Sequence, residues 1–179
     1  MKRLLLIQIS CFLLFLTVGS CTSAEKMTND RRQDFTADWT FRLGDDSLAS
    51  RPNYDDTAWR TLNLPHDWAI EGEFSKDNPS GTGGGALPGG IGWYRKTFIA
   101  DKADEGKRLR IDFDGVYMNS EVFINGHSLG VRPYGYVSFS YDLTPHIKWG
   151  EKNVIAVRVD NAEQPNSRWY SGCGIYRNV

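Results

Sequence analysis

The chain has 179 residues, of which 40% are hydrophobic, and a formal net charge of −1 at pH 7. That length suggests one domain large enough to bury a hydrophobic core. No segment accumulates basic residues, which excludes nucleic acid as a partner. The three cysteines and three histidines form no CxxC motif and no spacing typical of metal ligands. The sequence therefore indicates neither a metal site nor a cofactor.

Residues 1–20 have the pattern of a secretory signal peptide. Lys2 and Arg3 precede an apolar run over residues 4–16, which is too short to span a bilayer comfortably. The run leads into Val18-Gly19-Ser20-Cys21, which resembles the lipobox of bacterial lipoproteins. The resemblance implies cleavage before Cys21 and acylation of that cysteine. The alternative is an ordinary signal peptide followed by an incidental cysteine.

The lipobox sets the expected location. We expect an exported lipoprotein, anchored to a membrane through Cys21, in the periplasm or at the cell surface. Residues 21–34 are polar, lack apolar periodicity and are interpreted as a tether behind the lipidated cysteine. Cys11 would leave with the signal peptide and Cys21 would carry lipid, so Cys173 has no partner for a disulfide in the mature chain.

The folded part, residues 35–179, is expected to be all-β. Short segments alternate apolar and polar residues between turn signals, and no long segment keeps a helical period. Asn125-Gly126 predicts a two-residue hairpin turn, and one helical turn is expected at residues 55–58. The pattern predicts about eight strands in an antiparallel jelly-roll β-sandwich. The clearest strands cover residues 39–43, 59–64, 91–100, 109–113, 116–124, 137–141 and 155–159.

Residues 174–179 begin a further apolar alternation, and the sequence then stops without a turn or a polar tail. We expect this segment to be a strand with an unpaired edge, which natural proteins usually cover. We therefore expect the chain to be cut off from a longer protein.

Five strings in the folded part are too specific for a generic sandwich. They occur in the order of the N-terminal domain of glycoside hydrolase family 2, which they resemble. LPHDW together with SRWYSG resembles the β-galactosidase branch of that family more than its glucuronidase branch. The strings are DDTAWR at 55–60, LPHDW at 64–68, GIGWYRK at 90–96, VFING at 122–126, and SRWYSG at 167–172 followed by GIYR at 174–177.

The resemblance implies a galactose-binding-like sandwich, followed by an immunoglobulin-like sandwich and a (β/α)8 barrel. Family members retain the anomeric configuration and use two glutamates on the barrel, one as acid/base and one as nucleophile. The barrel needs ~250 residues and is absent from this sequence. No residue here is assigned a catalytic role, and the chain by itself is not assigned an enzymatic activity.

Asp67 is the first candidate for contact with a sugar. The resemblance places it on a loop at the mouth of the barrel, where a carboxylate would accept hydrogen bonds from two sugar hydroxyls. The alternative is that Asp67 caps a turn after Pro65, as Asp often does. His66 would help to shape this loop.

A second candidate group is Asn166, Ser167 and Arg168, where family members place a polar loop beside the sugar. Related enzymes often have Asp near this position, so the departure leaves the contact open. The alternative is that Arg168 forms a salt bridge with the barrel. Trp169 and Tyr170 either stack on a sugar ring or, as we favour, pack against another domain.

Three other features are interpreted as structural. Trp39, Trp59 and Trp93 are expected in the core. Residues 80–90 match the pattern GxGxxA, but they precede a strand and open no helix, so they are interpreted as a long mobile loop near the substrate entrance. His127 and His146 are interpreted as ordinary turn residues.

The leading functional hypothesis is the sugar-binding module of a β-galactosidase-like hydrolase, which shapes the sugar subsite and supports the catalytic barrel. Its partners would be a β-galactoside-type carbohydrate, the further domains of the enzyme, and a membrane through the lipid anchor. One alternative is a stand-alone, lipid-anchored carbohydrate-binding protein, for which the fold alone is weak support. The other is an inert truncated product.

Overall fold

The computed structural model describes residues 31–179, in which Asp34–Val179 form one compact unit. The predicted signal peptide, Cys21 and most of the predicted tether lie outside the described residues. Within the described part, no helix has the length and apolar character needed to cross a membrane.

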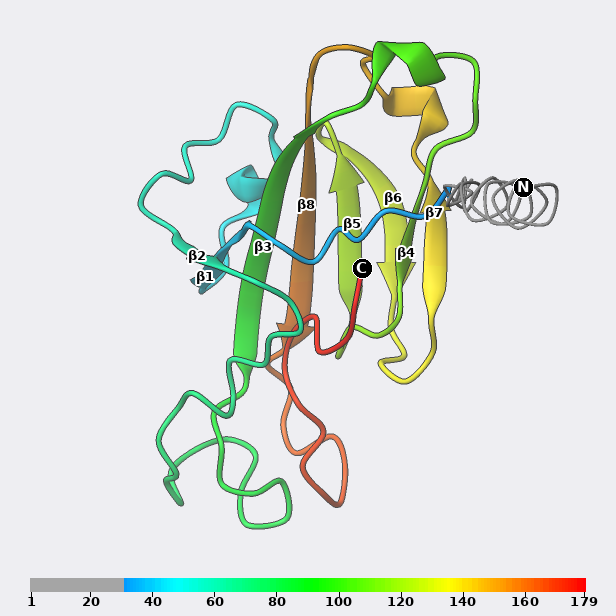
Figure 1. Ribbon diagram of the computed structural model, residues 1–179. Helices are drawn as coiled ribbons and strands as arrows, with labels where there is room; N and C mark the ends of the chain where they lie inside the picture. The colour runs from blue at the N-terminus through cyan, green and yellow to red at the C-terminus, as the bar shows by residue number, and fades with distance from the viewer. Residues whose placement is uncertain (1–30) are drawn as a thin grey trace, which may run out of the picture. The chain divides into compact units, whose positions relative to one another are not determined.

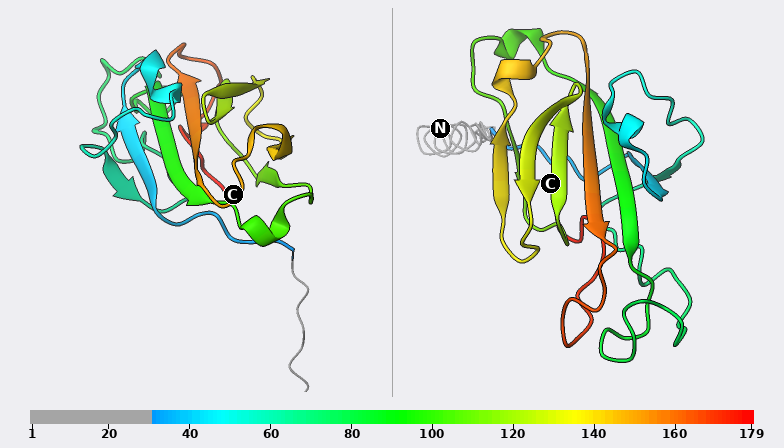
Figure 2. Two further views of the ribbon diagram at one scale, coloured as in Figure 1. Left: turned by 90° about the horizontal axis from the view of Figure 1, so that it is seen from above. Right: turned by 180° about the vertical axis from the view of Figure 1, so that it is seen from behind.

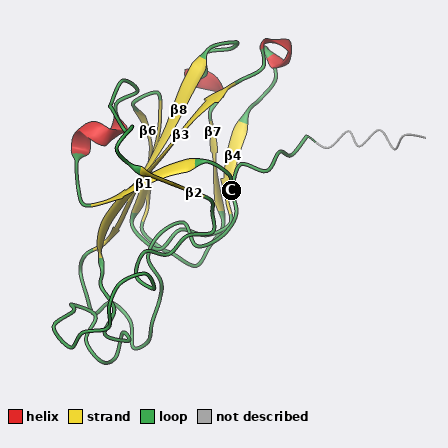
Figure 3. Cartoon of the chain, turned by 60° about the vertical axis from the view of Figure 1, so that its left-hand side comes forward, coloured by secondary structure: helices red, strands yellow, loops and turns green. Residues whose placement is uncertain are grey.

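The unit is all-β, and every strand pair in its two sheets is antiparallel, as predicted (Figure 1). One sheet has the strand order β2-β1-β3-β8-β5-β6, and the other pairs β4 with β7. The remaining regular elements are 3-10 turns, visible as short red segments in Figure 3. The elements are β1 (Trp39–Leu43), η1 (Ser47–Ser50), β2 (Arg60–Leu62), β3 (Gly90–Ile99), η2 (Lys102–Asp104), β4 (Arg110–Phe113), β5 (Ser120–Ile124), β6 (His127–Arg132), β7 (Phe139–Asp142), η3 (Thr144–His146) and β8 (Lys152–Asn161).

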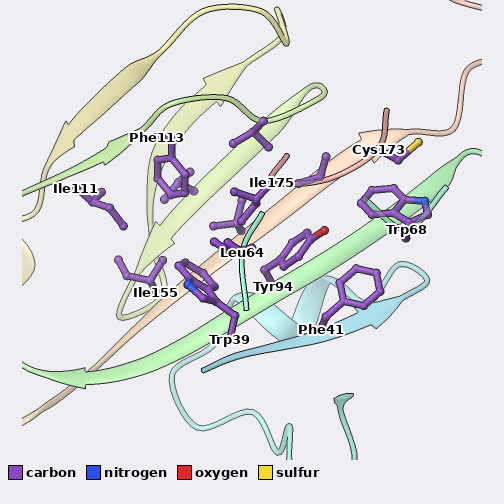
Figure 4. Packing of buried hydrophobic residues seen from close by; sticks show 14 of the residues in the cluster. Trp39, Phe41, Leu64, Trp68, Tyr94, Ile111, Phe113, Ile155, Cys173 and Ile175 are labelled. Carbon is purple, nitrogen blue, oxygen red and sulfur yellow. The ribbon is translucent and has the colours of Figure 1, made fainter. Parts of the chain in front are cut away.

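The main core lies on one face of the six-stranded sheet. Ile155, Val157 and Val159 alternate along β8 and are fully buried on this face. Across from them, Phe113 of β4 stacks on Phe139 of β7 with ring centroids 5.1 Å apart. Figure 4 shows these layers meeting around aromatic and aliphatic side chains. Alternation along the strands thus fills the core, because successive side chains of a strand point to opposite faces.

The opposite face of the large sheet carries a smaller cluster. Trp93 of β3 packs there with Trp59, whereas Trp39 belongs to the main core, so all three predicted core tryptophans are buried. Arg95 is also buried on this face, and its Nε donates to Oδ2 of Asp56 at 2.9 Å. This ion pair holds the segment between β1 and β2 against the sheet.

The hairpin between β5 and β6 confirms the predicted turn. Asn125 and Gly126 both have positive φ, at 50° and 85°, which is the requirement of a type I′ turn. In place of the helical turn expected at residues 55–58, the chain forms a single hydrogen-bonded turn, closed by a bond from Trp59 N to Asp56 O, and no 3-10 helix covers it.

The prediction that residues 174–179 form an unpaired edge strand is wrong. Gly174 pairs with Tyr117 through two backbone hydrogen bonds of 2.9 Å, Ile175 O accepts from His66 N at 2.8 Å, and Val179 O accepts from Phe35 N at 2.9 Å. The Ile175 side chain is fully buried in the main core. The segment, red in Figures 1 and 2, packs against the core-facing side of the large sheet.

Candidate functional site

The candidate residues lie on two long loops that leave the same end of the large sheet. One loop joins β2 to β3, and the other follows β8 (Figures 1 and 3). Gly90 at the start of β3 pairs with Asn161 at the end of β8, so the loops emerge side by side. Two residues predicted from separate strings, Asp67 and Tyr170, are brought together here.

Asp67 connects the two loops. Its Oδ1 accepts one hydrogen bond of 2.9 Å from Ala69 N, within its own loop, and another of 2.9 Å from Cys173 N, in the loop after β8. The hydroxyl of Tyr170 donates to Oδ2. The bond from Ala69 N is the turn-capping contact that the sequence analysis gave as the alternative. The bonds from Tyr170 and Cys173 also join the two loops, which capping a turn does not require.

Tyr170 is held as a neutral hydrogen-bond donor. Burial raises the pKa of its phenol far above the usual value, and the hydrogen bond to Asp67 and the charge of that carboxylate raise it further. The ring is only partly exposed. An ionised phenolate beside the carboxylate would place two like charges together, which disfavours ionisation.

His66 supports this loop from the core side. Its Nε2 lies 2.8 Å from a guanidinium nitrogen of Arg60, and its Nδ1 lies 2.7 Å from the hydroxyl of Tyr94. A guanidinium can only donate, so in the neutral ring the shorter contact with Arg60 makes Nε2 an acceptor and places the proton on Nδ1, although Oε2 of Glu71 lies 3.4 Å from Nε2 as well. Burial lowers the pKa of His66, against the opposing effect of Glu71. The imidazole is therefore a neutral, structural group, in keeping with the predicted role in shaping the Asp67 loop.

The side chains of Asn166 and Ser167 are already engaged in hydrogen bonds, and Asn166 also joins its loop to the segment between β4 and β5. Asn166 Nδ2 donates to Asn161 Oδ1 at 2.5 Å, and its Oδ1 accepts from Tyr117 at 3.2 Å. Ser167 Oγ donates to Trp169 O and lies 2.7 Å from Ser171 Oγ. Both side chains thus order the loop that presents the neighbouring residues.

Arg168 and Trp169 are exposed. Trp169 has 80% of its surface accessible, and no ion pair found in residues 31–179 includes Arg168. Both side chains are free to contact a ligand or another domain. Their roles stay predictions.

The glycine-rich stretch forms a series of hydrogen-bonded turns. Ser80 is buried, and its Oγ donates to Leu87 O at 2.7 Å, while Ala86 N donates to Gly81 O at 2.7 Å. Together with the loop after β8 it encloses a small hollow, whose lining includes Leu87, Trp169 and Tyr170. The stretch is therefore packed beside the candidate site.

Cys173 is unsuited to nucleophilic chemistry. It is buried, and its Sγ lies 2.9 Å from Asn161 Nδ2. Burial raises the pKa of the thiol to about 12, although the hydrogen bond from Asn161 opposes the rise. A thiol is inert until it ionises. Among residues 31–179, no group of three His, Cys, Asp or Glu side chains is placed to hold a metal ion.

The sequence did not reveal how Tyr170, Gly172 and Cys173 surround Asp67. A signal was present, since two glycines flank Cys173 and both have positive φ, at 81° and 122°. Such glycines mark a chain that must turn closely past another segment. Which segment it passes is a long-range property that no local pattern contains.

Comparison with known proteins gives the chain its family. A family model described as "Glycosyl hydrolases family 2, sugar binding domain" matches residues 86–179, just over half of the chain. The chain is 73% identical over 162 residues to the β-galactosidase BoGH2A of Bacteroides ovatus, covering 90% of this chain and 19% of that protein. It is 36% identical over 171 residues to a β-glucuronidase of Formosa agariphila, covering 88% of this chain and 17% of that protein.

A solved structure supports the same assignment. The crystal structure of a β-glycosidase from Bacteroides vulgatus matches with a TM-score of 0.79 and 52% identity, over 81% of this chain and 19% of that one. The chain thus spans about a fifth of the length of these relatives. It belongs to glycosyl hydrolases family 2, and what it carries is the sugar binding domain of that family.

Proposed function

We propose that this domain is the sugar-binding module of a β-galactoside-cleaving hydrolase, with Asp67 forming part of the pocket for the galactose unit. The observation that carries the proposal is the 73% identity to a β-galactosidase over nearly the whole chain. The β-glucuronidase relatives are less similar: a putative β-glucuronidase of Formosa agariphila is 50% identical over 172 residues, and a β-glucuronidase of the same organism is 36% identical. Asp67 also favours a neutral sugar, because its carboxylate is hydrogen-bonded to neutral donors and would oppose the carboxylate of a glucuronide.

The module would bind and position the sugar, and it would leave bond cleavage to another part of the hydrolase. Retaining cleavage needs two carboxyl groups ~5–5.5 Å apart on either side of the glycosidic bond. Asp67 is unsuited to either role, because three donors already bind its carboxylate. We infer that the catalytic pair lies on a barrel, which this domain supports.

A chimera would test this function. The domain of BoGH2A would be replaced by this one, and hydrolysis of chromogenic β-galactosides and β-glucuronides would be compared. We expect the chimera to cleave β-galactosides and the isolated chain to cleave neither substrate. A folded chimera that prefers β-glucuronides would contradict the proposed substrate. Turnover by the isolated chain that disappears on Asp67→Ala would contradict the module hypothesis itself.

We also propose that the domain is displayed on a membrane by acylation of Cys21, in the periplasm or at the cell surface. The support is the sequence Val18-Gly19-Ser20-Cys21 directly after a short apolar run. One acyl chain gives only marginal membrane binding, whereas two or more anchor stably. The tether at residues 21–34 would link the lipidated cysteine to the folded domain.

A further inference from the structure

The hydrogen bonds already made by Asp67 limit what it can offer a ligand. An ionised carboxylate has about four acceptor positions, two on each oxygen. Both positions on Oδ1 are taken, by the backbone N–H groups of Ala69 and Cys173. Tyr170 occupies one position on Oδ2. One acceptor position is left, so Asp67 can accept from one sugar hydroxyl and not from the two that we expected from its sequence.

Tyr170 supplies a second acceptor next to the first. Its only hydrogen is donated to Asp67, so the phenol oxygen can still accept but has nothing further to donate. The nearby polar side chains of Asn166 and Ser167 already make other hydrogen bonds, Asn166 also to the segment between β4 and β5. The remaining acceptor positions on Asp67 Oδ2 and on the phenol oxygen of Tyr170 are therefore adjacent. A ligand that binds both oxygens must donate both hydrogens.

Gly172 lies beside these two oxygens and has no side chain that could cover them. A Cβ atom at this position would lie 3.1 Å from Oδ2 of Asp67 and 4.0 Å from the hydroxyl of Tyr170. Any other residue would thus place its Cβ carbon against the pair. Gly172 has φ +81°, a conformation that glycine adopts without strain.

We propose that Oδ2 of Asp67 and the phenol oxygen of Tyr170 together accept hydrogen bonds from two adjacent free hydroxyls of the bound sugar. Neighbouring hydroxyl oxygens on a pyranose ring are spaced much as two hydrogen-bonded oxygens are, so such a diol matches the pair. Tyr170 then acts as a sugar ligand and as the residue that orients Asp67, and not as a stacking platform. This inference rests on the proposed function, because it assumes that the site binds a sugar.

The test titrates the purified chain with methyl β-galactoside and with each of its monodeoxy analogues. Binding is followed by NMR at the backbone amides of Gly172 and Cys173, which adjoin the pair. We expect the removal of either of two adjacent hydroxyls to weaken binding, by about 10-fold or more for the hydroxyl that faces Asp67 and about 3- to 10-fold for the one that faces Tyr170. The other deoxy analogues should bind like the parent sugar.

Tyr170→Phe separates the two contacts. In this variant the analogue that lacks the Tyr170-facing hydroxyl should bind as well as the parent sugar, while sensitivity to the other hydroxyl persists. Three results would overturn the inference and leave the proposed function standing. All analogues could bind equally well, or binding could depend on two hydroxyls that are not adjacent. In the third, binding to Tyr170→Phe would still be weakened by the loss of either hydroxyl. If methyl β-galactoside shifts neither amide, the inference is overturned, and the chimera with BoGH2A decides separately on the proposed function. The analogue series on the unmodified chain decides the matter even if the variant does not fold.

Discussion

Replacing Ile175 with alanine tests whether the C-terminal segment is an integral part of the core. The side chain is fully buried among the residues of the main core, and the backbone around it is bonded to Tyr117 and His66. Truncating a fully buried isoleucine removes transfer free energy and leaves a cavity, at a cost of about 2–5 kcal/mol. With a typical urea slope, such a loss lowers the midpoint of unfolding by roughly 1 M or more.

Ile70→Ala is the matched control, because Ile70 lies on the β2–β3 loop with 65% of its surface exposed. Its truncation should change the free energy of unfolding by no more than about 0.5 kcal/mol. Both variants would be unfolded in urea beside the parent chain, with the slope of the transition monitored. A loss below about 1 kcal/mol for Ile175→Ala, with an unchanged slope, would refute the packing argument.

Three further predictions concern single groups. Cys21→Ala should move the protein from the membrane fraction to the soluble fraction, because the acyl anchor is lost; a variant that stays on the membrane would contradict the lipobox interpretation. The lowered pKa of His66 means that the unfolded state binds more protons below about pH 6.5, so the free energy of unfolding should be greatest above that pH and fall as the pH drops below it; in His66→Gln this fall, measured by urea unfolding, should shrink, and an equal fall in the variant would show that another group causes it. In Asp67→Asn the pKa of Tyr170 should move down towards its usual value, since the carboxylate that helps to raise it is gone. The pKa would be followed by absorbance in an alkaline titration, and comparison with Tyr170→Phe identifies the signal of Tyr170. An unchanged titration would contradict the contact between Asp67 and Tyr170.

The strands were predictable where apolar residues recur between turn signals. β3 and β8 were found for this reason, they form the longest pair in the sheet, and both are buried on both faces over their middle residues. β6 was missed because it lies at the sheet edge and is largely polar, with Leu129 and Val131 as its apolar residues. The alternation at residues 174–179 was misinterpreted, since Ile175 is buried by packing between layers while its backbone follows an irregular path.

The candidate site was predictable residue by residue but not as an arrangement. Asp67 and Tyr170 were each singled out within a string, yet 103 positions separate them in the chain. Whether Tyr170 contacts a sugar, another domain or Asp67 depends on which loops the sheet places side by side. The pairing of Gly90 with Asn161 decides this, and register between distant strands cannot be derived from either strand alone.

The central claim is that Asp67 binds the sugar while the catalytic residues lie in another domain of the enzyme. Asp67→Asn in the chimera with BoGH2A tests this claim most directly. Asparagine keeps an oxygen for the N–H groups of Ala69 and Cys173 and replaces the acceptor Oδ2 by a donor. Asp77→Asn, an exposed change in the same loop, is the control. We predict that Asp67→Asn lowers kcat/KM on a β-galactoside by roughly 10- to 200-fold, the loss of a hydrogen bond to a charged group, while Asp77→Asn leaves it unchanged. An unchanged kcat/KM in a correctly folded Asp67→Asn chimera would contradict the claim and reduce Asp67 to a residue that braces a turn.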